Sequence, residues 1–181
     1  MRALIYIIET IASLFTFILL LRFWLPWVGA DFRNPISQGI LKATSPLINP
    51  LRRFVPSIGR IDTATVLVAF LLQAITVVAV LLIMSDPVLP RFVVVAAIFE
   101  LLTLSLHMFT FAIILKIVLS WIAPGTYNPA TALLTDLTDP ILRPLRRYIP
   151  PVGGFDVSPI FAIIILGALS ILLEDSRSLF M

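Results

Sequence analysis

Residues 44–62 read TSPLINPLRRFVPSIGRID, and residues 138–156 read TDPILRPLRRYIPPVGGFD. Their identical residues all lie 94 positions apart, without a gap, and an Asn-Pro pair precedes each stretch at the same offset. So many matches at one offset indicate an internal duplication. The matched residues that define the motif are Asn34, Pro35, Pro46, Pro50, Gly59 and Asp62 in the first copy, and Asn128, Pro129, Pro140, Pro144, Gly153 and Asp156 in the second.

The segments around these stretches are apolar enough to cross a bilayer. Of the 181 residues, 60% are hydrophobic and 13% charged, and the mean hydropathy is +1.08. Soluble domains are about 45–50% apolar and about 25% charged. A transmembrane helix needs about 20 consecutive apolar residues, and four stretches satisfy this, at about 4–25, 63–84, 92–121 and 157–174. The sequence therefore predicts an all-α membrane protein with four transmembrane helices.

The offset divides the chain into a first repeat at residues 1–86 and a second at 87–181, with two of the four spans in each. Because two is an even number of crossings, both copies insert with the same orientation. They are therefore expected to be parallel tandem repeats rather than an inverted pair. Each repeat is predicted to consist of a helix, an amphipathic basic hairpin and a second helix.

The hairpin itself is expected to begin with a short helix. Asn followed by Pro is a favourable helix start, with Asn as the cap and Pro in the first helical position. The segment 35–42 places apolar side chains on one face, which suits a helix lying in the headgroup region. The residue before a proline is disfavoured in helix, so we expect the helix to end near Thr44, and its counterpart near Thr138. The apolar faces comprise Ile36, Ile40 and Leu41 in the first copy, and Leu133, Leu134 and Leu137 in the second.

The orientation in the membrane follows from the basic residues. The two repeated loops carry eight Lys and Arg residues, whereas the opposite side carries three. By the positive-inside rule, both loops are predicted to be cytoplasmic and both termini periplasmic, in a bacterial inner membrane.

The pairs Arg52-Arg53 and Arg146-Arg147 are the most specific polar feature of the chain. One interpretation is lipid anchoring, because arginines at the cytoplasmic face pair with anionic headgroups. The other is docking of an acidic partner or a phosphorylated ligand on the planar guanidinium groups. The aspartates that end the motif, Asp62 and Asp156, are expected to cap the helices that follow them.

Within the predicted spans, Glu100, Thr103 and His107 share one helix face and form a possible intramembrane polar site. This site is a candidate for proton or ion movement, although Glu100 could instead lie at the outer interface and leave His107 as a packed histidine. Arg22 and Lys116 lie near the cytoplasmic span ends and are expected to reach the headgroups as anchors. Glu9 and Gln73 are expected to mediate helix contacts.

Sequence features of common catalytic sites are missing. The chain has one histidine and no cysteine, so a His-based zinc site or a two-histidine haem site within one chain is excluded. The sequence also lacks a Walker loop and a dinucleotide-binding glycine fingerprint. We therefore expect no enzymatic activity, no metal and no cofactor.

At the repeated Thr-x-Pro-x-x-x-Pro-Leu-Arg-Arg-x-x-Pro-x-x-Gly-x-x-Asp pattern, the chain resembles the YggT family of bacterial membrane proteins, which includes YlmG and related plastid proteins. The resemblance covers essentially the whole chain and implies an integral inner-membrane protein without an established biochemical activity. It further implies links with osmotic or potassium tolerance, with envelope and division-related organisation and, in plastids, with haem attachment to a b-type cytochrome. The first copy departs from the second at Gly59-Arg60, where the second has Gly153-Gly154.

The predicted function is a non-catalytic scaffold or assembly factor for envelope or membrane complexes. Its duplicated cytoplasmic Arg-Arg hairpins would bind anionic headgroups and a membrane-protein partner or a second copy of the chain; nucleic acid is not an expected partner. One alternative is a small oligomeric transporter or channel in ion or osmotic homeostasis. The other is a haem or cytochrome assembly factor that shares His107 between chains.

Overall fold

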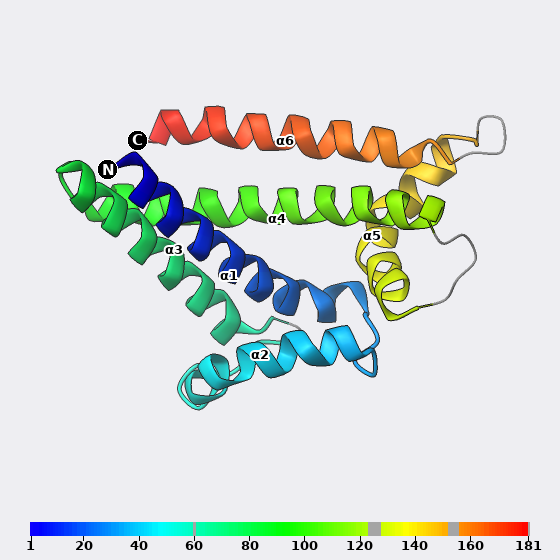
Figure 1. Ribbon diagram of the computed structural model, residues 1–181, viewed down its shortest axis with the longest axis horizontal. Helices are drawn as coiled ribbons and strands as arrows, with labels where there is room; N and C mark the ends of the chain where they lie inside the picture. The colour runs from blue at the N-terminus through cyan, green and yellow to red at the C-terminus, as the bar shows by residue number, and fades with distance from the viewer. Residues whose placement is uncertain (60, 123–127, 152–155, 181) are drawn as a thin grey trace.

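The computed structural model describes residues 1–59, 61–122, 128–151 and 156–180, with side chains described as far as residue 177. This part of the chain is all-α and forms six helices (Figure 1). In chain order the helices are α1 (Arg2–Val28), α2 (Pro35–Arg52), α3 (Thr63–Met84), α4 (Pro90–Ile122), α5 (Pro129–Tyr148) and α6 (Ser158–Phe180).

Four of the helices, α1, α3, α4 and α6, are long and apolar enough to cross a membrane. Their outward faces carry exposed large apolar side chains, such as Leu14, Ile75 and Ile164, each more than 60% exposed. Apolar surface of this extent suits lipid rather than water. The prediction of an all-α fold with four membrane-length helices is therefore confirmed. These four helices are compatible with a multi-pass membrane protein.

The two remaining helices are longer than the sequence suggests, and the expected helix ends near Thr44 and Thr138 are wrong. Helix α2 continues through Pro46 and Pro50 to Arg52, with 18 residues. Helix α5 likewise contains two prolines, Pro140 and Pro144, and has 20 residues. Each loop therefore contains a full amphipathic helix, which in the first loop is followed by a short turn.

Hydroxyl groups precede the first internal proline of each of these helices and bond within the helix. A proline in a helix removes one backbone donor and crowds the carbonyl four residues earlier. In α2, the Thr44 hydroxyl donates to the Ile40 carbonyl at 2.7 Å, and the Ser45 hydroxyl donates to the Leu41 carbonyl at 2.6 Å. In α5, the Thr138 hydroxyl donates to a carbonyl one turn earlier, also at 2.7 Å. These hydroxyls donate to carbonyls in the turn before each proline, whereas the carbonyls of Lys42 and Asp136, which Pro46 and Pro140 leave without a backbone donor, receive none of these bonds.

The helix starts agree with the sequence prediction. The Ile36 N–H donates to Asn34 Oδ1 at 2.9 Å, and the Thr131 N–H donates to Asn128 Oδ1 at 2.9 Å. Each Asn is followed by a proline in the first turn. The Asn34 side chain also donates to the Pro129 carbonyl at 2.6 Å, which joins the start of α2 to the start of α5.

Helix α1 lies at the centre of the packing. One apolar cluster joins α1 to α2 and α3 and includes Leu19, Ile48 and Val68. A second joins the end of α1 to α5 through Leu25 and Leu137. A third joins α1 to α4, α5 and α6. The predicted apolar face of α5 is confirmed by burial, whereas the buried residues of α2 are Ser37, Thr44 and Ile48 rather than the predicted ones.

Both chain ends lie at one end of the molecule, α5 lies toward the other, and α2 lies along one side, below α1 and α3 in this view (Figure 1). The predicted boundary between residues 86 and 87 falls in the turn between α3 and α4, where Ser85 has a positive φ of 62°. This arrangement places both basic helices away from the termini and defines the region where the predicted site residues gather.

Candidate functional site

Arg22, near the C-terminal end of α1, is buried in the contact with α2. Its side chain is 3% exposed. Its Nη1 donates to Thr44 Oγ1 at 2.6 Å, to the Leu41 carbonyl at 3.1 Å and to Ser45 Oγ at 3.4 Å. The expectation that Arg22 reaches the headgroups as an anchor is therefore wrong. Because α2 continues past Thr44 and packs on α1, it covers the guanidinium and supplies the acceptors for it.

Asp62 lies between Arg22 and Arg52. Its Oδ2 is 3.5 Å from Arg22 Nε, and its carboxylate also accepts from Arg52, with Arg52 Nε at 3.3 Å from Oδ1. The Thr65 hydroxyl donates to Asp62 Oδ2 at 2.7 Å. Asp62 precedes α3 but makes no side-chain cap hydrogen bond, so the cap prediction is wrong for this residue. The carboxylate is instead occupied by the two arginines and Thr65.

These contacts decide the protonation of Asp62. Burial acts to raise the pKa of Asp62. Hydrogen bonds from Arg52 and Thr65, with the charges of Arg52 and Arg22, outweigh burial and hold that pKa below its ordinary value. Asp62 is therefore a carboxylate at neutral pH, and it ties α1, the end of α2 and the start of α3 together.

The second loop contains a related network around Lys116, which lies 94 positions after Arg22. Lys116 Nζ donates to Thr138 Oγ1 and to Asp139 Oδ1, both at 3.1 Å. Asp139 also pairs with Arg143 at 3.2 Å and with Arg146 at 3.5 Å. Burial acts to raise the pKa of Asp139, but the hydrogen bonds and charges of its three basic neighbours hold it below its ordinary value. Lys116 is thus also held inside the protein rather than acting as a free anchor.

Arg146 also pairs with Asp156, through Nε and Oδ2 at 2.7 Å. Asp156 Oδ1 accepts the Ser158 N–H at 2.9 Å, so the cap prediction is confirmed here. Burial acts to raise the pKa of Asp156. Hydrogen bonds from Arg146 and Ser158 outweigh burial and hold this pKa below its ordinary value. Gly153 lies outside the described residues, whereas Gly59 turns the first loop with a φ of 60°.

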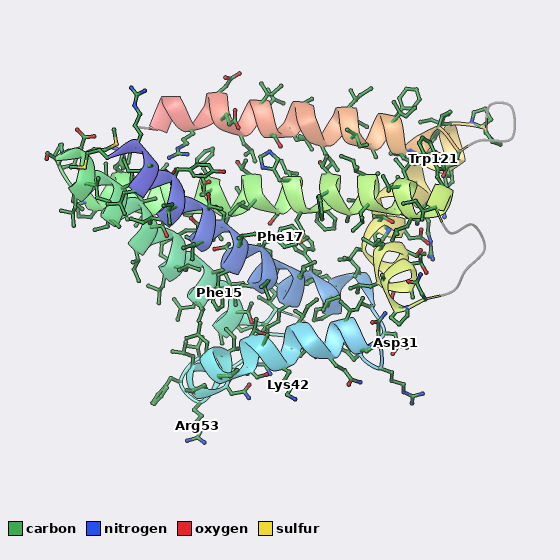
Figure 2. All side chains as sticks on the ribbon, viewed as in Figure 1. Phe15, Phe17, Asp31, Lys42, Arg53 and Trp121 are labelled. Carbon is green, nitrogen blue, oxygen red and sulfur yellow. The ribbon has the colours of Figure 1, made fainter. Side chains whose placement is uncertain are left out.

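The two arginines of each pair have different roles. Arg52 and Arg146 both pair with the aspartate ten residues later. Arg53 and Arg147 are exposed and have no ion pair or side-chain hydrogen bond with the described residues. Figure 2 shows Arg53 and Lys42 directed away from the body of the protein on α2. The second arginine of each pair is therefore the one available to a ligand.

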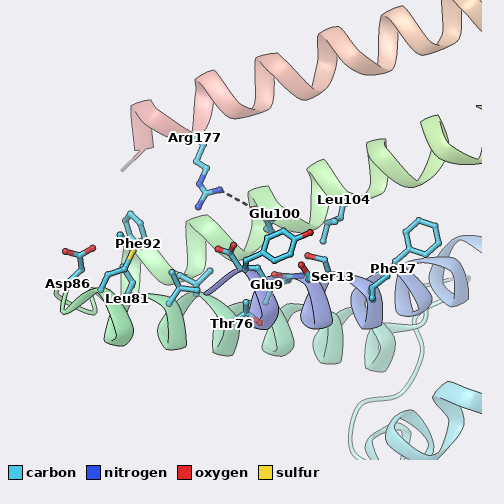
Figure 3. Close-up of a pocket in the computed structure, with 17 residues that line it drawn as sticks. Glu9, Ser13, Phe17, Thr76, Leu81, Asp86, Phe92, Glu100, Leu104 and Arg177 are labelled. Carbon is cyan, nitrogen blue, oxygen red and sulfur yellow. Dashed lines mark hydrogen bonds and ion pairs between the residues drawn. The ribbon is translucent and has the colours of Figure 1, made fainter. Parts of the chain in front are cut away.

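The predicted intramembrane site is not gathered at one point. Glu100 Oε2 pairs with Arg177 Nη1 of α6 at 3.2 Å (Figure 3). Thr103 is half-buried, and His107 is exposed on the surface of α4. Sequence reasoning missed Arg177 as a partner because the two residues are 77 positions apart.

Glu100 instead lines a cleft of about 770 Å³ whose walls come from α1, α3, α4 and α6 (Figure 3). Glu9, Ser13 and Gln73 are among its other polar residues. Gln73 Nε2 donates to Thr16 Oγ1 at 2.9 Å, which confirms the expected helix contact for Gln73. Within the described ranges, no group of three or more His, Asp or Glu residues is placed to hold a metal ion.

Four membrane-length helices, with two cationic helices joined to them by ion pairs, are compatible with a multi-pass membrane protein. The family model described as CCB3/YggT matches residues 1–83 and 95–176. The chain belongs to the CCB3/YggT family.

Relatives in other organisms agree with this assignment. The chain is 43% identical over 177 residues to an uncharacterised Pseudomonas aeruginosa protein, covering 96% of this chain and 89% of the relative. It is 39% identical over 166 residues to the uncharacterised protein YggT of Escherichia coli K12, covering 92% and 86%. A chloroplastic YlmG homologue of Arabidopsis thaliana is 38% identical over 66 residues, which is 35% of this chain and 25% of the relative. No solved structure matches the chain.

Proposed function

We propose that this protein is a non-catalytic scaffold or assembly factor of the bacterial inner membrane. Its two cationic helices face the cytoplasm and bind anionic headgroups or an acidic membrane-protein partner. The observation that supports the proposal is that the two arginines of each Arg-Arg pair have different surroundings. Arg52 and Arg146 are held by aspartates, while Arg53 and Arg147 are exposed and free of ion pairs with the described residues.

This arrangement suits binding for a physical reason. A lysine or arginine on a mobile loop loses side-chain and backbone freedom when it binds, which weakens the interaction. Here the neighbouring arginine fixes the backbone through its ion pair before any ligand arrives. The exposed guanidinium then offers planar donors to phosphate or carboxylate groups at a defined place.

We further propose that the chain arose by duplication of one unit, so that the two cationic helices lie on the same side of the membrane. The two segments that match the family model begin 94 residues apart. The ion pairs of Arg52 with Asp62 and of Arg146 with Asp156 have the same offset. Two units of two spans each place both loops on one side, and the excess of basic residues in them favours the cytoplasm.

Native mass spectrometry tests the lipid-binding proposal. The purified protein, stripped of lipid in a neutral detergent, is offered phosphatidylglycerol and phosphatidylcholine in equal amounts. We expect a preference for phosphatidylglycerol that the double variant Arg53→Gln/Arg147→Gln loses. The matched control Arg2→Gln/Arg91→Gln removes the same charge from the opposite end and is expected to keep it. An unchanged preference in the first variant refutes the proposal.

The orientation has a separate test, which the lack of cysteine makes simple. Single cysteines at position 53 and at position 2 are labelled with a membrane-impermeant maleimide in spheroplasts and in inverted vesicles. We expect position 53 to react in inverted vesicles and position 2 in spheroplasts. The opposite pattern overturns the orientation.

The cleft beside Glu100 supports a second candidate function, movement of a cation. Carboxylates are rare within membrane-spanning helices and tend to face a cavity or a polar partner, and both Glu9 and Glu100 line this cleft. Cation flux in liposomes that is lost in Glu9→Gln and Glu100→Gln favours this function. Absence of flux across a gradient between pH 5 and pH 8 excludes it under those conditions.

A further inference from the structure

A second cationic feature of the first loop is a pocket rather than a surface. Its volume is about 460 Å³, and it lies between the end of α1, helix α2 and the turn before α3. Its polar lining includes the two arginines Arg22 and Arg52, with Ser45, Asn49 and Ser57. None of these residues belongs to the exposed pair on which the proposed function rests.

The buried cation in this pocket has an unfilled hydrogen-bonding position. Arg22 is 3% exposed, and its Nε is buried without a hydrogen-bond partner among the described residues. Asp62 Oδ2 is 3.5 Å from that nitrogen, which is longer than an N–H···O hydrogen bond. Buried guanidinium groups normally have their donors satisfied. Arg22 and Arg52 both face Asp62, so these three side chains together carry a net charge of one positive.

The second loop gives the corresponding basic residue, Lys116, a carboxylate partner. Ser45 and Asn49 correspond, 94 positions later, to Asp139 and Arg143. There the Asp139 carboxylate accepts directly from the half-buried Lys116 Nζ at 3.1 Å. In the first loop the corresponding residue is a serine, whose hydroxyl is 3.4 Å from Arg22 Nη1. The second loop therefore supplies its own anion at a position where the first loop has a neutral group.

We propose that the pocket of the first loop binds one phosphate group, which takes the place that Asp139 fills in the second loop. Arg22 and Arg52 supply guanidinium donors, which with Asp62 leave one net positive charge, and the Asn49 amide supplies a neutral donor. Phosphate suits this set because guanidinium groups bind its oxygens with short, charge-assisted hydrogen bonds. Asp62, which also lines the pocket, remains paired with Arg52, so the charge of Arg22 is the one left for the phosphate.

The test measures thermal stabilisation of the purified protein in neutral detergent. Inorganic phosphate and short-chain phosphatidic acid are titrated separately, with sodium chloride at equal ionic strength as the control. We expect saturable stabilisation by at least one of the two ligands beyond that of chloride. Saturation by inorganic phosphate identifies a soluble source, and saturation by phosphatidic acid alone identifies a lipid headgroup. A response to neither ligand overturns the proposal.

Two substitutions at the pocket sharpen this test. Ser45→Asp supplies the carboxylate of the second loop, so we expect the apparent affinity for phosphate to fall about tenfold or more. Asn49→Arg supplies the matching cation and is expected to tighten binding several-fold. This second variant keeps the proposal testable if Ser45→Asp does not fold. Unchanged affinity in a folded Ser45→Asp protein, or in Asn49→Arg, refutes the site.

A third variant separates this site from the proposed function. Arg53→Gln/Arg147→Gln is expected to keep the phosphate response, since neither residue lines the pocket. If that variant loses the lipid preference but keeps the phosphate response, both proposals stand. If it loses the phosphate response as well, the binding is a property of the exposed arginines and the pocket assignment is wrong.

Discussion

Replacing Asp62 with asparagine removes the charge that faces Arg22 and Arg52 but keeps the shape of the side chain. The side chains of Arg22 and Asp62 are 3% and 9% exposed. Removing one partner of a buried pair costs about 3–5 kcal/mol, because the other charge stays buried. Arg52 is 44% exposed and can turn to water, so its share is about 0–1 kcal/mol. Since Arg22 keeps three neutral acceptors, we expect a total near the lower limit, about 3 kcal/mol.

The matched control is Asp156→Asn. Asp156 and Arg146 are 39% and 40% exposed, and Arg146 keeps Asp139 as a second partner. Asparagine also caps a helix about as well as aspartate does. We therefore expect Asp156→Asn to cost less than about 1 kcal/mol.

Unfolding of the purified protein by SDS in mixed micelles, followed by circular dichroism, measures both values. The free energies of unfolding of the two variants are compared with that of the unchanged protein at neutral pH. The reasoning is refuted if Asp156→Asn destabilises the protein as much as Asp62→Asn, or if neither has an effect. Either result means that the burial of Arg22 does not make Asp62 the more important carboxylate.

The pH dependence of stability, the contact of α1 with α3 and two glycines offer three further tests. Because folding lowers the pKa of Asp62, the stability that this carboxylate contributes is complete above its ordinary pKa of 3.8 and is lost as the pH falls below that value. SDS unfolding measured from pH 7 to pH 3 is expected to show this loss of stability. The variant Asp62→Asn is expected to lose less stability over the same pH range. Gln73→Leu removes the hydrogen bond to Thr16 and is expected to cost about 0.6 to 1.7 kcal/mol by the same assay. Gly29 has a φ of 72°, so Gly29→Ala is expected to destabilise the protein by about 1 kcal/mol. Gly39 lies in the interior of α2, so Gly39→Ala is expected to stabilise the protein slightly. Equal effects of the two substitutions contradict this prediction.

The spans and helix starts could be predicted from the sequence because their causes are local. A run of about 20 apolar residues has few structures open to it in a bilayer besides a helix. The cap at Asn34 and the cap at Asn128 depend on residues within three positions. The contact of Gln73 with another helix was also expected, since an isolated amide in a span tends to bond across a helix interface.

The ends of α2 and α5 and the role of Arg22 could not be predicted, because their causes are distant in sequence. The rule that a proline ends a helix is a local one, whereas α2 and α5 continue through their prolines while packed against α1. The burial of Arg22 depends on α2, which packs on it from about 20 residues away. The sequence did contain one signal for the role of Arg22. Lys116, also basic, lies 94 residues after Arg22 at the matching position of the second repeat, and this favours a specific partner for Arg22 over a contact with lipid headgroups.

The hydrogen bond between Asn34 of α2 and the Pro129 carbonyl of α5 has a consequence for affinity. A second bond, from the Asp31 N–H to Asp136 Oδ2 at 3.3 Å, joins the same two regions. The two cationic helices are therefore held at one spacing, and a partner that contacts both meets the second at a high effective concentration. Linked weak contacts of this kind can raise overall avidity by about 10² to 10⁴ without any single strong one. If the proposed binding surface is correct, we expect a partner with two acidic groups at the matching distance to bind more tightly than a partner with one.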